Sequence, residues 1–163
     1  MPRGKKEQIF SREIVKGLRE RHRSWAVWNV NDAITPGVPD LIVITPETER
    51  TRAATIWLEL KIVDNFPSGE FSWRGAGGKG RVSPEQKAWL QRLHAMKQQA
   101  ALLVLVHRTN WRERFAVLIT DLQADSWRIA LLPTFPRSTA STSGLYVGLD
   151  HWLESLIRKD NEQ

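Results

Sequence analysis

The chain has 163 residues, of which 24 are Lys or Arg and 18 are Asp or Glu, giving a formal net charge of +6. This length predicts a single domain, and 41% hydrophobic with 26% charged residues excludes an intrinsically disordered chain. The absence of cysteine excludes disulfides, thiolate catalysis and zinc–thiolate sites. The basic balance favours a polyanionic partner, with nucleic acid ahead of an anionic membrane surface.

No segment of the sequence resembles a membrane span or a secretory signal. The longest unbroken apolar run, residues 100–106, is far shorter than the ~20 residues that a membrane helix needs. The first residues, Met-Pro-Arg-Gly-Lys-Lys, lack the apolar centre of a signal peptide. We therefore expect a cytoplasmic protein that has no membrane partner.

Hydropathy patterns predict alternating helices and strands. A helix is expected over residues 7–23, because Phe10, Ile14 and Leu18 recur every four residues. Three strands should follow, over residues 25–30, 40–45 and 54–63, separated by a Pro- and Gly-containing loop and a charged turn. The elements expected further along are a Gly-rich loop over 64–82, a helix over 83–98, strands over 101–106 and 114–120, an edge strand over 126–132, a loop over 133–144 and a helix over 149–159.

This order, α-β-β-β-α-β-β, predicts one α/β domain in which helices flank a mixed sheet. The core is expected over residues 7–120, and residues 121–163 are expected as a C-terminal extension that ends in a short helix. Ser83-Pro-Glu-Gln86 predicts the start of the second long helix through a capping box. On that helix, the side chains expected to face inward are those of Trp89, Leu90, Leu93 and Met96.

Glu59 and Lys61 lie in the middle of an apolar strand. Being two residues apart, they project from the same face, about 7 Å apart along the strand. Burial of both charges costs several kcal/mol unless each has a partner. The simplest interpretation is a mutual ion pair on a solvated sheet face, in an α/β enzyme of unrelated function.

Asp40 begins the preceding predicted strand, directly after Pro39. If the two strands are neighbours, Asp40 lies beside Glu59, and two carboxylates at a strand end suit Mg²⁺ or Mn²⁺. A lysine such as Lys61 beside the metal can position a water or stabilise charge on a phosphate. Alternatively, Asp40 is an ordinary turn residue after Gly-Val-Pro.

Gln86 has two possible roles. It completes the capping box with Ser83, and it lies one helical turn before Trp89 and Leu90, where it could reach the metal-bound water or a phosphate. The two roles compete for one side chain, and both stay open at this point.

Two motifs resemble a known nuclease superfamily. Gly37-Val-Pro-Asp40 followed, after 18 intervening residues, by Glu59-Leu-Lys61 resembles the PD-(D/E)xK nuclease signature. Residues 80–90, with their Ser-Pro-Glu-Gln and Trp-Leu pairs, resemble a segment of the virus-type replication-repair nuclease (VRR-NUC) branch. That branch includes standalone phage-borne domains and is close to the archaeal-type Holliday junction resolvases. The resemblance covers about residues 25–106, half of the chain.

The resemblance implies a restriction-endonuclease-like fold and a DNA endonuclease that hydrolyses phosphodiester bonds in a bacterial or phage-infected cell. It implies that Asp40, Glu59 and the backbone carbonyl of Leu60 bind Mg²⁺ or Mn²⁺, that Lys61 is catalytic and that Gln86 assists. It also implies branched DNA such as a four-way junction as substrate, in repair or recombination, and a homodimer that leaves 5′-phosphates. Trp127 and Trp152 are the apolar candidates for a dimer interface.

The first helix departs from the family pattern. The family often places a metal-binding glutamate there, but the position nearest to it here is Ser11. Glu7, Glu13 and Asp32 are the other candidates, and the choice among them stays open. Without such a carboxylate, the alternative function is a non-catalytic nucleic-acid-binding module on a nuclease fold.

Two segments are candidates for contacts with DNA. Trp73, Arg74, Lys79 and Arg81 flank a Gly-rich loop, and basic and aromatic residues on a loop suit a phosphate backbone and an unstacked base. Lys5 and Lys6 form part of an N-terminal basic arm. The alternative for both segments is plain solvation of charged surface.

Overall fold

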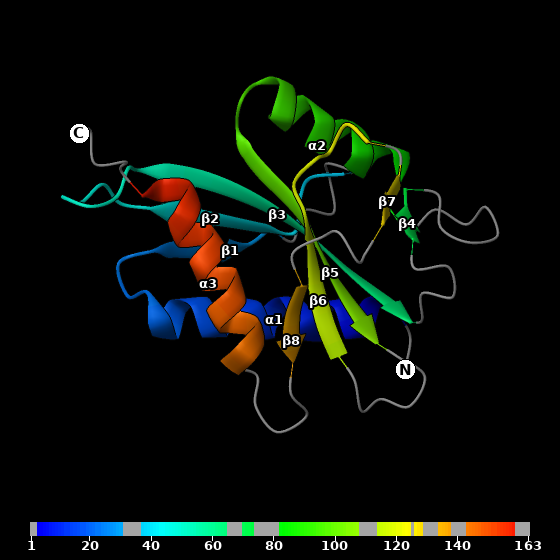
Figure 1. Ribbon diagram of the computed structural model, residues 1–163, viewed down its shortest axis with the longest axis horizontal. Helices are drawn as coiled ribbons and strands as arrows, with labels where there is room; N and C mark the ends of the chain where they lie inside the picture. Colours follow the sequence, from blue (N-terminus) through cyan, green and yellow to red (C-terminus); the bar gives the residue numbers. More distant parts are fainter. Residues whose placement is uncertain are drawn as a thin grey trace.

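The computed structural model describes residues 3–30, 37–64, 70–73, 82–107, 114–124, 126–128, 134–137 and 143–158. The elements are α1 (Arg3–Arg21), β1 (Ala26–Asn29), β2 (Leu41–Thr45), β3 (Ala54–Asp64), β4 (Glu70–Ser72), α2 (Pro84–Ala95), β5 (Gln99–His107), β6 (Arg114–Ile119), β7 (Ser126–Arg128), β8 (Thr134–Arg137) and α3 (Ser143–Ile157). The predicted α/β class, with helices flanking a mixed sheet, is confirmed (Figure 1).

The main sheet has six strands in the order β1-β2-β3-β5-β6-β8. All neighbouring pairs are antiparallel except the central pair, β3 and β5, which is parallel. A parallel pair needs a crossover connection, and α2 lies in that connection. The short strands β4 and β7 pair with each other in a separate two-stranded sheet.

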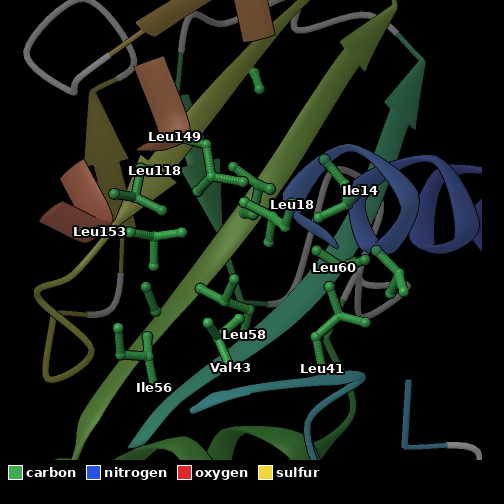
Figure 2. Packing of buried hydrophobic residues seen from close by; sticks show 14 of the residues in the cluster. Ile14, Leu18, Leu41, Val43, Ile56, Leu58, Leu60, Leu118, Leu149 and Leu153 are labelled. Atoms are coloured by element: carbon green, nitrogen blue, oxygen red, sulfur yellow. The ribbon is translucent and has the colours of Figure 1, made fainter. Parts of the chain in front are cut away.

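The two faces of the main sheet are covered by different helices (Figure 1). On one face, side chains of α1 and α3 pack against the sheet, and Figure 2 shows Ile14, Leu18, Leu149 and Leu153 in one cluster with Leu58, Leu60 and Leu118 of the sheet. On the other face, α2 contributes its buried leucines, and the cluster there includes Leu90, Leu102 and Val104. The sheet is therefore buried on both sides.

Strand β3 alternates as predicted. Ile56, Leu58, Leu60 and Ile62 belong to the apolar cluster under α1 and α3, whereas Val63 belongs to the cluster under α2. Glu59 and Lys61 share the α2 side of the strand, but this side is not solvated. Glu59 has no exposed surface and Lys61 is 7% exposed, so an ion pair on an open sheet face is the wrong description.

Helix α3, which lies in the segment expected to be a C-terminal extension, packs into the core of the fold. Leu149, Leu153 and Ile157 of α3 lie in the largest apolar cluster. Asp150, which is buried, accepts hydrogen bonds from Arg21 and from His22, beside the end of α1. The C-terminal helix thus ties the first helix to the sheet.

Two strands differ from the sequence prediction. β8 lies within the segment expected to be a Ser/Thr/Pro loop, and it pairs with β6 at one edge of the sheet. Its Pro136 lies opposite Phe115, and an edge strand is where a sheet tolerates proline. β7, expected at an edge of the main sheet, instead pairs with β4.

The helices also differ from the prediction at their ends. α1 begins at Arg3, so the backbone of Lys5 and Lys6 is helical and does not form an extended arm. Met96, expected to face inward, is the C-cap of α2 and is 59% exposed, because the chain turns at Lys97 with a positive φ of 57°. Trp152, a candidate for a dimer interface, is partly buried against the main core. Among the described helices, none has both the length and the apolar character of a transmembrane segment.

Candidate active site

Asp40 and Glu59 lie opposite each other on neighbouring strands. The antiparallel register of β2 and β3 pairs Leu41 with Leu58, and its continuation by one residue places Asp40 across from Glu59. Residues opposed in this way have Cα atoms about 5 Å apart. The carboxylate Oδ2 of Asp40 accepts the backbone N–H of Leu60 at 2.8 Å. This hydrogen bond holds Asp40 against β3 beside the Glu59-Leu-Lys61 segment.

Gly37 allows the loop before Asp40 to lie against the first turn of α2. Its φ of +88° is in the region that favours glycine. A Cβ atom at Gly37 would be 2.5 Å from the carbonyl carbon of Glu85 and 2.8 Å from the backbone nitrogen of Gln86. Analysis of the sequence gave Gly37 no role of its own. The Gly-x-Pro-Asp motif could have indicated this role, because its glycine allows an unusual backbone angle and its proline restricts the backbone just before Asp40.

The N-terminus of α2 forms the predicted capping box. The Ser83 hydroxyl accepts the backbone N–H of Gln86 at 3.2 Å, and Oε1 of Gln86 accepts the backbone N–H of Ser83 at 3.0 Å. A hydrogen bond from the Ser83 side chain, with one from its own backbone amide, holds the pKa of the exposed Glu85 carboxyl below its ordinary value. An acidic residue in the first turn also favours the helix dipole.

Gln86 closes the capping box and at the same time contacts the candidate site through Glu59. While Oε1 closes the capping box, Nε2 of the same amide donates to Oε1 of Glu59 at 2.5 Å. The cap and the contact with Glu59 do not compete, because a carboxamide has an acceptor at one end and donors at the other; contact of Gln86 with a metal-bound water or a phosphate stays a prediction. The cap therefore fixes the rotamer with which Gln86 reaches Glu59.

Lys61 pairs with the same oxygen of Glu59. Its Nζ lies 2.8 Å from Oε1 of Glu59, and the two side chains are 9% and 0% exposed. Glu59 thus receives an ammonium and an amide donor, which offset the cost of burying its charge. With Asp40 beside them, the formal charges are two carboxylates and one ammonium, which leaves the cluster net negative.

The donor set at this cluster suits a hard divalent cation. Asp40, Glu59 and the carbonyl of Leu60 are oxygen donors on adjacent strands, the ligand type that Mg²⁺ and Mn²⁺ prefer. Within the described ranges, no group of three His, Cys, Asp or Glu residues is arranged to hold a metal. A site here would therefore rest on two carboxylates and backbone or water oxygens.

The described part of α1 has a serine at the position where the resemblance to the PD-(D/E)xK nucleases predicts a glutamate. Ser11 is buried, and its Oγ accepts Nδ2 of Asn29 at 2.6 Å, which joins α1 to the end of β1. Glu13 is half-buried on the same helix. The side chain of Glu7 and all of Asp32 lie outside the described residues.

Trp73 is not available as a stacking surface for a base. It is 4% exposed, its Nε1 donates to the carbonyl of Ala124 at 2.7 Å, and Nζ of Lys87 lies 5.5 Å from its ring centroid. The expectation that it contacts DNA is therefore wrong. Its proposed partners Arg74, Lys79 and Arg81 lie outside the described residues, as do the side chains of Lys5, Lys6 and Trp127.

Comparison with protein-family models and with curated proteins found no match. The functional argument consequently depends on the geometry of the cluster.

Proposed function

We propose that the protein is a metal-dependent DNA endonuclease with a restriction-endonuclease-like arrangement of its sheet and helices. The observation that carries the proposal is the convergence of Asp40, Glu59, Lys61 and Gln86 on one buried point between β2, β3 and the start of α2. Glu59, Lys61 and Gln86 interact through one buried oxygen, and Asp40 is held beside them by the backbone N–H of Leu60. Burying such a polar cluster is costly, and a catalytic role accounts for that cost better than packing does.

In this proposal Asp40, Glu59 and the Leu60 carbonyl hold Mg²⁺ or Mn²⁺. The bound ion supplies a more acidic water and offsets charge on the phosphate. Lys61 lies within hydrogen-bond distance of Glu59 and offers an ammonium to a phosphate oxygen or to the attacking water. Gln86 fixes the orientation of Glu59 from the capped end of α2.

DNA as the substrate is supported by the net charge of +6 and by the resemblance of the two motifs. Within that class we propose branched DNA, such as a four-way junction, cut into 5′-phosphate products by a homodimer. The proposed arrangement of the fold is supported by the order β1-β2-β3-β5-β6, by the parallel central pair and by helices on both faces.

A cleavage panel tests the proposal. Labelled four-way junction, flap, splayed fork, linear duplex and single strand are incubated with Mg²⁺ or Mn²⁺ and with wild type, Asp40→Asn or the matched control Glu49→Gln. Glu49 is an exposed carboxylate in the turn at the opposite end of β2. We expect metal-dependent cleavage, fastest on the junction, that is lost in Asp40→Asn and kept in Glu49→Gln. Equal cleavage by all three proteins would contradict the assignment.

A non-catalytic nucleic-acid-binding module is the second candidate. It is favoured by Ser11, which occupies the family's helix-glutamate position and is engaged with Asn29. Calorimetric titration with Mn²⁺ separates the two functions. An enzyme binds the ion and loses affinity in Asp40→Asn, whereas a binding module shows no difference between the two proteins.

A further inference from the structure

A groove of about 580 Å³ runs between α1 and the edge strand β1, outside the candidate active site. Helix α1 contributes three cationic side chains, those of Arg12, Lys16 and Arg19, and the carboxylate of Glu20. Their positions, four and three residues apart, place the three cations along one side of the helix. The lining is therefore net positive.

The other wall of the groove includes an exposed aromatic residue. Trp28 of β1 lines the groove and leaves 50% of its surface in solvent. Large apolar side chains with this exposure are few among the described residues, the others being Ile9 and Met96. An exposed tryptophan beside cationic side chains is the combination that binds single-stranded nucleic acid, through base stacking and phosphate contacts.

Hydrogen bonds hold the two walls of the groove, α1 and β1, together. Arg19 donates from Nε and Nη2 to the carbonyl of Val27, at 3.0 and 2.5 Å, which fastens α1 to the unpaired edge of β1. The Ser11–Asn29 hydrogen bond joins the same two elements further along. Arg12 and Lys16, both exposed, lie about 6 Å apart along the helix axis and face solvent. Lys16 forms a surface ion pair with Glu20, at 3.8 Å, of the kind that contributes little.

One residue that lines the groove, Asn29, lies close to Asp40 in the sheet. Asn29 pairs with Leu41 in the sheet, and the N–H of Val30 donates to the carbonyl of Asp40 at 2.7 Å. Trp28 is two residues before Val30, about 7 Å along the strand. A strand held in the groove therefore leads toward the carboxylate cluster.

We propose that this groove binds a single-stranded segment of the DNA substrate, with one base stacked on Trp28 and the adjacent phosphates on Arg12 and Lys16. The inference rests on the proposed function for the identity of the polymer. A single strand is favoured over a duplex because stacking on Trp28 requires a base that is not already stacked in a helix. Among branched DNAs, a flap or a splayed fork supplies such unpaired bases in its single-stranded arms.

Fluorescence anisotropy in EDTA tests the groove without cleavage. The probes are a labelled oligothymidine and a labelled duplex of equal length. Trp28→Ala is expected to weaken binding of the oligothymidine by about five- to a hundredfold, the range for one lost base–aromatic stack. Trp28→Phe should retain most of the affinity, and the duplex should be affected less. The matched control is Met96→Ala, which removes another exposed apolar side chain at the far end of α2.

The salt dependence of binding separates phosphate contacts from stacking. Arg12→Ala and Lys16→Ala should each lower the slope of log affinity against log salt by about 0.7, the value for one phosphate contact on a single strand. Trp28→Ala should leave the slope unchanged, and Arg50→Ala, in the exposed β2–β3 turn, should behave as wild type.

The outcomes distinguish the groove from the proposed enzyme. The proposed binding of single-stranded DNA in the groove is overturned if wild type and Trp28→Ala bind oligothymidine equally well. It is also overturned if Met96→Ala lowers the affinity as much as Trp28→Ala does. Both results hold even if DNA is cleaved. Affinity that depends on Trp28, Arg12 and Lys16 supports the groove even if no substrate in the cleavage panel is cut, a result that would overturn the enzyme alone.

Discussion

Strand β3 presents apolar side chains to α1 and α3 on one face and a buried ion pair to α2 on the other. On the first face, Leu58 and Leu60 pack by contacts that have no preferred direction. On the second, Glu59 and Lys61 depend on specific partners, each at a defined distance. One strand can therefore supply stability with its even-numbered residues and chemistry with its odd-numbered ones, because side chains alternate along it.

Removal of one member of the Glu59–Lys61 pair is the change with the largest expected effect on stability. Lys61→Met leaves the Glu59 carboxylate buried without its ammonium, and we expect the free energy of unfolding to fall by about 3–5 kcal/mol. The double variant Glu59→Gln with Lys61→Met buries no charge, and it should recover most of that loss. Urea unfolding of wild type, Glu59→Gln, Lys61→Met and the double variant measures the coupling. A double variant as unstable as the sum of its singles would show that the two charges do not interact.

Gly37→Ala is expected to have an intermediate effect. An alanine at φ +88° costs about 1–2 kcal/mol, and its Cβ would collide with the α2 backbone at Glu85. Because the loop must then move away from α2, Asp40 shifts relative to Gln86. The cleavage barrier should therefore rise by more than the free energy of unfolding falls. Thermal unfolding and cleavage rates are compared with those of Val38→Ala in the same loop. A wild-type cleavage rate in Gly37→Ala would show that the contact between Gly37 and the start of α2 does not position the active site.

Gln86→Ala and Ser83→Ala are a matched pair with the smallest effect on stability. Each removes one half of the capping box and should cost about 1 kcal/mol. Only Gln86→Ala also removes the donor to Glu59. We expect cleavage to fall about tenfold in Gln86→Ala, an increase of about 1.4 kcal/mol in the barrier, and to stay near wild type in Ser83→Ala. Equal cleavage rates in Gln86→Ala and Ser83→Ala would show that Gln86 acts only as a helix cap.

The local signals in the sequence were sufficient for most of the fold around the cluster. The alternation of Ile56, Leu58 and Leu60 predicted the apolar face of β3, and Ser83 with Gln86 predicted the start of α2. Both depend on neighbours in the chain, which a sequence displays directly. The sequence also allowed the pairing of Asp40 with Glu59 to be predicted, because their strands are joined by residues 46–53 alone, which favours antiparallel neighbours.

The remaining features depend on contacts between distant segments. β8 lies in a stretch of Ser, Thr and Pro residues, and its pairing with β6 is what makes it a strand. Trp73 has a Gly-rich, basic neighbourhood, yet Ala124, 51 residues away, accepts its indole N–H in the interior. Trp28 shows the reverse case, since its place on an edge strand leaves it half in solvent. No local pattern carries this information.

Cleavage by one variant from each face of β3 tests the central claim most directly. Glu59→Gln with Lys61→Met removes both charges from the α2 face, and Ile62→Val removes one methylene from the opposite face at a cost of about 0.5–1.5 kcal/mol. With both proteins folded, as checked by circular dichroism, the account predicts that Ile62→Val cuts the four-way junction at the wild-type rate and that the double variant does not cut it. Cleavage by the double variant at the wild-type rate would contradict the assignment of the active site to this cluster.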